Sequence, residues 1–224
     1  MNFKRTSVIA ALLCAAAASQ ASISWFTTLG GWNGSAGATS FTENFSGFVT
    51  DTQFRTGAVG INGGSIAQEG TNASNFRNLI DVSPFDFTDN NGTAHASMLT
   101  NSGVTTVRMT FANALSAFGF ETWIGQPLEG ASVDVYNGAT LLGSFDISNV
   151  DGSFTGFVLD GGDTATSIVW RSTTFVDGPG GEGFGLDNLV GVNAMNPVPE
   201  PFTMVLLGGA ALAGYRRVRA RKLG

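Results

Sequence analysis

Apolar and polar residues alternate along much of the chain after residue 40. Val107, Met109 and Phe111 occupy every second position, with polar residues between them. The same period of two recurs in four further runs: 133–136, 141–147, 154–159 and 167–170. Because successive side chains of a strand point to opposite faces, each run predicts a strand with one face buried in a core.

Short turn signals separate these runs. They are Asn137-Gly138, Asp151-Gly152, 160–163 and 177–181. The Asn-Gly pair favours a type I′ turn, which predicts a hairpin between a strand ending at Tyr136 and one starting at Thr140. The body shows no helical repeat. We therefore predict an all-β fold, an antiparallel jelly-roll-like β-sandwich.

The N-terminal residues have the pattern of an export signal. Lys4 and Arg5 precede an apolar stretch, 8–18, and Ser19-Gln20-Ala21 supplies the small residues that a signal peptidase recognises. This order is typical of a secretory signal peptide, which we predict to span residues 1–21.

Beyond the signal peptide the chain divides into three segments. Residues 22–40 are rich in Gly, Ser, Thr and Ala, with Trp25 and Trp32 as isolated aromatics, and are expected to form an irregular lead-in or a first edge strand. Residues 41–195 form the predicted sandwich domain. Residues 196–224 differ in composition from the rest and are treated as a separate sorting segment.

Charge is distributed unevenly between these segments. Residues 22–196 contain four arginines, no lysine and sixteen acidic residues, so their net charge is 4 − 16 = −12, against −6 for the whole chain. Such a field repels phosphate backbones and argues against a nucleic-acid partner. The single cysteine, Cys14, lies in the predicted signal peptide, so the exported body can form no disulfide.

The C-terminal segment combines three features. Pro197, Pro199 and Pro201 remove backbone donors and favour an extended, accessible strap. Residues 202–215 are fourteen uncharged, mainly apolar residues, a helix of about 21 Å against a hydrocarbon core of about 30 Å. A basic cluster expected to stop transfer on the cytoplasmic side follows: Arg216, Arg217, Arg219, Arg221 and Lys222.

This order of features resembles the PEP-CTERM sorting signal. The resemblance rests on Val198-Pro199-Glu200-Pro201, the glycine-containing apolar run and the closing arginines. It implies that an exosortase in the inner membrane of a Gram-negative bacterium recognises Pro199, Glu200 and Pro201 and removes the tail. It also implies a host that makes extracellular polysaccharide. Residues 182–192, GEGFGLDNLVG, resemble the last strand of many exported β-sandwich domains.

Side chains for nucleophilic catalysis are scarce. The only histidine is His95, expected to be a surface or strand-packed residue, and no Gly-x-Ser-x-Gly motif, second histidine or body thiol accompanies it. Carboxylates are the remaining catalytic groups, but most lie beside glycine in turns, where they cap the backbone. We therefore predict no catalytic residues and no enzyme.

Calcium is the one cofactor that the sequence suggests. Glu43 and Asp187 lie in apolar strand contexts near the start and end of the body. The first and last strands of jelly-roll modules are often neighbours, so the two carboxylates are candidate ligands of a structural calcium ion. Alternatively, Glu43 faces solvent and Asp187 hydrogen-bonds a loop. Residues 86–92, DFTDNNG, depart from calcium-loop spacing and are interpreted as a polar turn.

Aromatic faces offer candidate platforms for sugar rings. The three considered are Trp123, Tyr136 and Trp170. Trp170 follows Ile168 at strand spacing and is expected in the core, whereas Trp123 adjoins the loop IGQPLEG and is the candidate ligand-binding residue.

Three functions remain open at this stage. The first is a non-enzymatic protein of the cell surface or extracellular matrix that binds exopolysaccharide. The second is a polysaccharide hydrolase or lyase using paired carboxylates, and the third a purely structural matrix protein. In each case we expect signal peptidase and an exosortase-type enzyme as partners. The inner membrane would hold the C-terminal helix only until processing releases the protein.

Overall fold

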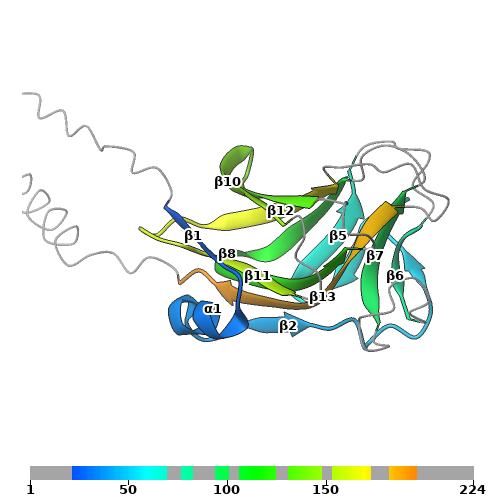
Figure 1. Ribbon diagram of the computed structural model, residues 1–224, viewed down its shortest axis with the longest axis horizontal. Helices are drawn as coiled ribbons and strands as arrows, with labels where there is room; N and C mark the ends of the chain where they lie inside the picture. Colours follow the sequence, from blue (N-terminus) through cyan, green and yellow to red (C-terminus); the bar gives the residue numbers. More distant parts are fainter. Residues whose placement is uncertain are drawn as a thin grey trace, which may run out of the picture.

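The structure is a computed structural model that describes residues 22–69, 77–82, 94–100, 106–124, 131–147, 153–172 and 182–195. The fold within these ranges is antiparallel β, as predicted (Figure 1). Its elements are β1 (Ile23–Phe26), α1 (Leu29–Ala36), β2 (Phe41–Glu43), β3 (Thr52–Gln53), β4 (Val59–Ile61), β5 (Gly64–Gln68), β6 (Arg77–Asp81), β7 (His95–Thr100), β8 (Thr106–Ile124), β9 (Ala131–Asn137), β10 (Thr140–Asp146), β11 (Ser153–Leu159), β12 (Ala165–Ser172) and β13 (Glu182–Asn193).

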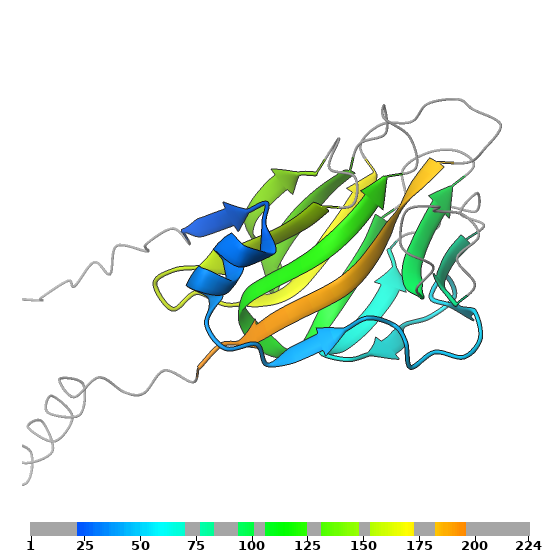
Figure 2. The ribbon, with the colours of Figure 1, turned by 60° about the horizontal axis from the view of Figure 1, so that its bottom comes forward.

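Two sheets share the long strand β8. Residues 106–111 of β8 lie between β5 and β12, and β9 and β10 continue that sheet, which we call the first sheet. Residues 115–124 lie between β11 and β13 in the second sheet, which extends through β7 and β6 to β3. Figure 2 shows β8 and β13 side by side. The β-sandwich prediction is confirmed.

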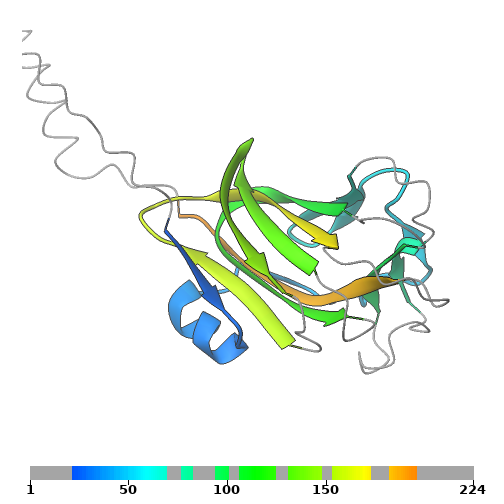
Figure 3. The same ribbon diagram turned by 45° about the horizontal axis from the view of Figure 1, so that its top comes forward.

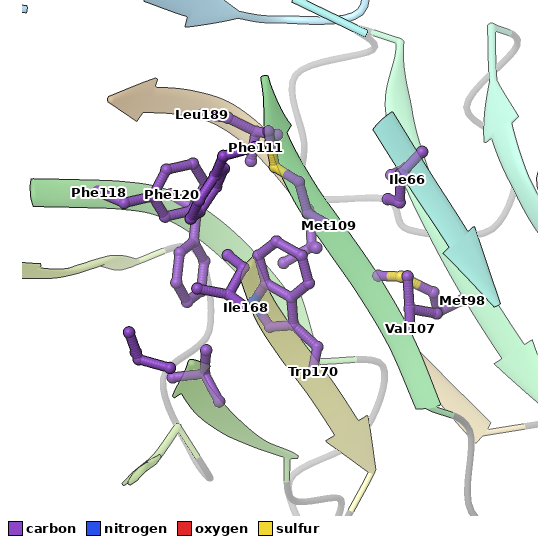
Figure 4. Close-up of a cluster of buried hydrophobic side chains, with 14 of the residues drawn as sticks. Ile66, Met98, Val107, Met109, Phe111, Phe118, Phe120, Ile168, Trp170 and Leu189 are labelled. Atoms are coloured by element: carbon purple, nitrogen blue, oxygen red, sulfur yellow. The ribbon is translucent and has the colours of Figure 1, made fainter. Parts of the chain in front are cut away.

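The core fills the space between the sheets with aliphatic and aromatic side chains. Trp170 and Ile168 project from β12 toward Met109 and Phe120, and all four are fully buried (Figure 4). The rings of Trp170 and Phe120 meet edge to face, with centroids 5.3 Å apart, a favoured aromatic geometry. The prediction that Trp170 belongs to the core is confirmed.

The predicted hairpin is present, but its turn differs from the prediction. β9 and β10 pair through Asn137 and Thr140, so Gly138 and Ala139 are the two central residues. Only Gly138 has a positive φ, 57°. A positive φ at the first central position alone is typical of type II′, whereas type I′ requires it at both.

Residues 22–40 form the first edge strand, which was the second of the two predicted possibilities, followed by a helix, and are not an irregular lead-in. β1 pairs with β11, and its Trp25 stacks on Phe145 of the first sheet with centroids 4.9 Å apart. α1 lies on the outer side of β1 and β11 (Figure 3). There its Trp32 is fully buried in a second cluster with Phe154, Ala117 and Val192. This segment therefore belongs to the folded domain.

Both terminal segments fall outside the described residues. These comprise the predicted signal peptide, 1–21, and the sorting segment, 196–224, with Pro199, Glu200, Pro201, the apolar helix 202–215 and the basic cluster. Within the part of the chain that the structure describes, no helix is both long and apolar enough to cross a membrane.

Candidate functional site

The outer face of the first sheet carries a cluster of interacting polar side chains. On β9, Val133 and Val135 point into the core, so Asp134 and Tyr136 point outward. The same alternation on β8, β10 and β12 brings further polar residues to this side. We define the polar face as Glu69, Arg108, Asp134, Tyr136, Ser144, Ser167 and Arg171.

Asp134 is the centre of this face. Its Oδ1 accepts a hydrogen bond from Ser144 Oγ at 2.6 Å, and its Oδ2 accepts one from Arg171 Nη2 at 2.8 Å. The Tyr136 hydroxyl lies 3.5 Å from the same Oδ2. The carboxylate is only 14% exposed, whereas the Arg171 side chain is 40% exposed. Asp134 is therefore held by three strand residues, with an arginine at its solvent side.

Arg108 contacts three other residues of the polar face, Tyr136, Ser167 and Glu69. Its guanidinium carbon lies 5.0 Å from the centroid of the Tyr136 ring, a cation–π distance. Nη1 donates to Ser167 Oγ at 2.6 Å, and Nε donates to the Glu69 carboxylate. These contacts orient Tyr136 before any ligand arrives, because guanidinium and ring hold each other in place.

The arrangement suits a ligand rich in hydroxyl groups. A sugar hydroxyl both donates and accepts, and the face offers carboxylates that accept, guanidinium groups that donate and hydroxyls that do both. The half-buried Tyr136 adds an aromatic ring with a polar end. All these groups except Glu69, which directly follows β5, lie on paired strands, so binding would require little ordering of the protein.

Glu43, a predicted calcium ligand, has a structural role in this fold. It is 9% exposed, and its two carboxylate oxygens accept backbone N–H groups at 2.6 Å each: Oε1 from Phe45 and Oε2 from Asn62. The alternative that Glu43 faces solvent is therefore wrong. Its carboxylate joins the end of β2 to the β4–β5 turn.

Asp187, the other predicted calcium ligand, lies on the opposite face of the second sheet. β2 and β13 are neighbours, as expected, and Glu43 is opposite Leu189, which points into the core. Leu186 also points inward, so Asp187 points outward. The β8–β13 register shifts between Asp187 and Val190, and Asn188, within this shift, has a φ of 49°. Because of this bulge, Asp187 and Leu189 point to opposite faces of the sheet. The structure therefore does not bring Glu43 and Asp187 together around one ion.

A second group of polar side chains lies on that outer side. His95 of β7 is fully buried and opposite Asp81 of β6, which is 1% exposed. His95 is thus the strand-packed residue that the sequence allowed, and its burial keeps it from contact with a dissolved ligand. Within the described ranges, no three His, Cys, Asp or Glu side chains are grouped so as to hold a metal ion.

Trp123, the predicted ligand-binding residue, lies on β8 with Gly185 opposite, but its side chain is outside what the structure describes. Its role stays a prediction. Tyr136 was one of the three aromatic platforms considered, and it is the one that the structure places among polar groups. The residues missed were Arg108, Asp134 and Arg171. Part of their signal was present, since Arg108 and Asp134 occupy polar positions within predicted strands and Arg171 directly follows one.

Comparisons with known proteins identify no family for this chain. No protein-family model and no curated protein matches it. Among solved structures it is similar to a mutant GH29 fucosidase from Ruminococcus gnavus in complex with fucose, at 12% identity and a TM-score of 0.33 over 60% of this chain. It is also similar to the CBM32-1, CBM32-2 and M60 catalytic domains of ZmpB from Clostridium perfringens, at 12% identity and a TM-score of 0.36 over 78%. The chain spans 26% and 17% of those chains.

Proposed function

We propose that this chain is an exported, non-enzymatic protein of the cell surface or extracellular matrix that binds polysaccharide through its polar face. The observation that carries the proposal is the preformed cluster around Asp134 and Tyr136. It combines an aromatic ring with fixed donors and acceptors, the groups that hold a ligand in a defined orientation. A jelly-roll strand order is the finer form of the fold that we propose with it.

Export and sorting are part of the same proposal. The predicted signal peptide and the PEP-CTERM-like segment make signal peptidase and an exosortase-type enzyme the expected partners. The start of β1 and the end of β13, which adjoin these segments, lie at the same end of the sandwich (Figures 1 and 2). Before processing, a C-terminal helix in the inner membrane would therefore hold the sandwich by this end. Afterwards the protein would be at the cell surface or extracellular.

Replacing Tyr136 with alanine is expected to weaken binding to the host's exopolysaccharide at least about tenfold, or about 1.4 kcal/mol. The change removes the ring and releases Arg108 from its stacked position. Affinity electrophoresis in gels containing the polysaccharide measures the effect. Val49→Ala is the control, because Val49 is 88% exposed and lies outside the polar face.

The same assay separates the three functions. Retention without a product supports binding. New reducing ends or unsaturated sugars would instead support the carboxylate-dependent hydrolase or lyase. If the protein is not retained and no product forms, the result supports the purely structural matrix protein.

Replacing Pro199, Glu200 and Pro201 together with alanine is expected to leave the tail attached and the protein in the inner-membrane fraction. The reason is that the proposed exosortase would no longer recognise its motif. Immunoblotting of membrane and culture fractions measures mass and location, with Pro197→Ala as a control outside the tripeptide. Normal processing of the triple variant would contradict the sorting proposal.

A further inference from the structure

We infer that the polar face takes an uncharged polysaccharide, which crosses the strands from Tyr136 toward Ser65. This inference rests on the proposed function and adds the chemical class and direction of the ligand. Two independent features of the first sheet carry it, a row of hydroxyl groups and the pairing of its charges.

The row of hydroxyl groups crosses four adjacent strands. Tyr136 on β9 is directly opposite Ser167 on β12, Ser167 is opposite Thr110 on β8, and Thr110 is opposite Ser65 on β5. Residues directly opposite in neighbouring strands have side chains on one face. The four positions therefore form a line about 14 Å long, at about 4.8 Å per strand. None of the four residues is acidic or basic. Ser167 is only 5% exposed and its hydroxyl accepts from Arg108, so Tyr136, Thr110 and Ser65 are the members that a ligand can reach.

The charges beside this row are already matched. Arg171 pairs with Asp134, and Arg108 pairs with Glu69. Each guanidinium is already largely neutralised by its carboxylate partner, so an acidic sugar gains less attraction here than it would from an unpaired arginine. An anion that drew an arginine away would also leave its Asp or Glu partner without a counter-charge. An uncharged sugar can add hydrogen bonds to both pairs without separating them.

The net charge of the predicted exported body also favours an uncharged ligand. Residues 22–196 carry sixteen acidic residues against four arginines and no lysine. A polyanion would therefore approach a surface of its own sign, whereas an uncharged chain meets no such barrier. The hydroxyl row and the charge balance thus favour the same ligand class.

The one apolar residue within the adjacent row, Val169, is consistent with this ligand as well. In the adjacent row, Asp134 of β9 is opposite Val169 of β12, which is in turn opposite Arg108 of β8. Val169 is fully buried beneath this surface. Because Val169 is not accessible, a ligand would contact the polar side chains around it.

The test separates host exopolysaccharide by anion exchange into uncharged and acidic fractions, and titrates each into the exported protein. We expect the uncharged fraction to bind at least about tenfold more tightly, with a Kd that changes less than about twofold between about 0.05 and 0.3 M NaCl. Preference for the acidic fraction would overturn this inference and leave the proposed function standing. Binding of neither fraction would overturn both.

A matched pair of variants tests the direction across the strands. Thr110→Val removes one hydroxyl from the row and keeps the branched shape, and it should weaken binding of the uncharged fraction about fivefold. Thr42→Val makes the same change at an exposed position of β2, outside the first sheet, and should leave binding unchanged. Equal affinities of the two variants, with folding verified by circular dichroism, would contradict a ligand running over Thr110.

Discussion

Replacing Trp32 with alanine is expected to lower the free energy of unfolding by about 3–5 kcal/mol, the range for removing a large buried aromatic side chain. Trp32 is fully buried on the outer side of the second sheet, with its ring 5.8 Å from that of Phe154. Its indole Nε1 donates to the backbone oxygen of Phe157 at 3.0 Å. The substitution opens a cavity under α1 and removes the hydrogen bond to the backbone oxygen of Phe157. Urea unfolding followed by circular dichroism measures the loss.

Two further variants separate the parts of this effect. Trp32→Phe keeps an aromatic ring but removes the hydrogen bond to Phe157, so a smaller loss is expected, with about 1 kcal/mol of it from the bond. Leu29→Ala changes the same helix at a side chain that is 43% exposed and should cost about 0.5 kcal/mol. A Trp32→Ala protein as stable as Leu29→Ala would show that α1 does not stabilise the domain.

The helix itself could not be predicted from local sequence. Its eight residues, LGGWNGSA, include three glycines, each about 1 kcal/mol less favourable than alanine in a helix interior. One local signal was present, since the Thr28 side chain caps the helix by accepting from Gly31 N. The remaining stabilisation comes from contact with the second sheet. In particular, Gly156 lacks a Cβ, which would lie 2.7 Å from Trp32 Cδ1.

The strands of the core were predictable because their alternation is a local property. Val107, Met109, Ile168 and Trp170 all face the core as their spacing indicates. Strand pairing is not local, and the polar face depends on it. Arg108 contacts Tyr136 only because β12 brings β8 and β9 to its two sides, a neighbourhood that the sequence pattern does not specify.

The predicted Glu43–Asp187 pair shows how one residue can change a site. The strands that carry Glu43 and Asp187 are neighbours, as expected, since β2 pairs with β13, although the first strand of the fold, β1, pairs with β11. Asn188 then shifts the register, and its left-handed backbone is a conformation in which asparagine is enriched. A shift of one residue exchanges the faces of a strand. Asp187 therefore points away from the side on which Glu43 lies.

Replacing Glu43 with alanine is expected to lower the free energy of unfolding by about 3 kcal/mol, because one buried and one part-buried hydrogen bond to its carboxyl group are lost together. The carboxylate holds the backbone N–H of Phe45, whose φ is 56° and whose side chain is fully buried. A left-handed backbone is costly for such a bulky residue, so Glu43 helps to fix an otherwise unfavoured conformation. Its other oxygen holds Asn62 N of the β4–β5 turn.

Glu69→Ala is the matched control for this variant. Glu69 is also a paired glutamate beside a strand, but its side chain is 38% exposed, and exposed ion pairs contribute about 0–1 kcal/mol. Thermal unfolding of both variants and the unsubstituted protein, with and without calcium, then separates the two roles of Glu43. The structural role predicts a large loss for Glu43→Ala in both conditions. A melting temperature that rises with calcium only when Glu43 is present would contradict it and support the ion-binding pair instead.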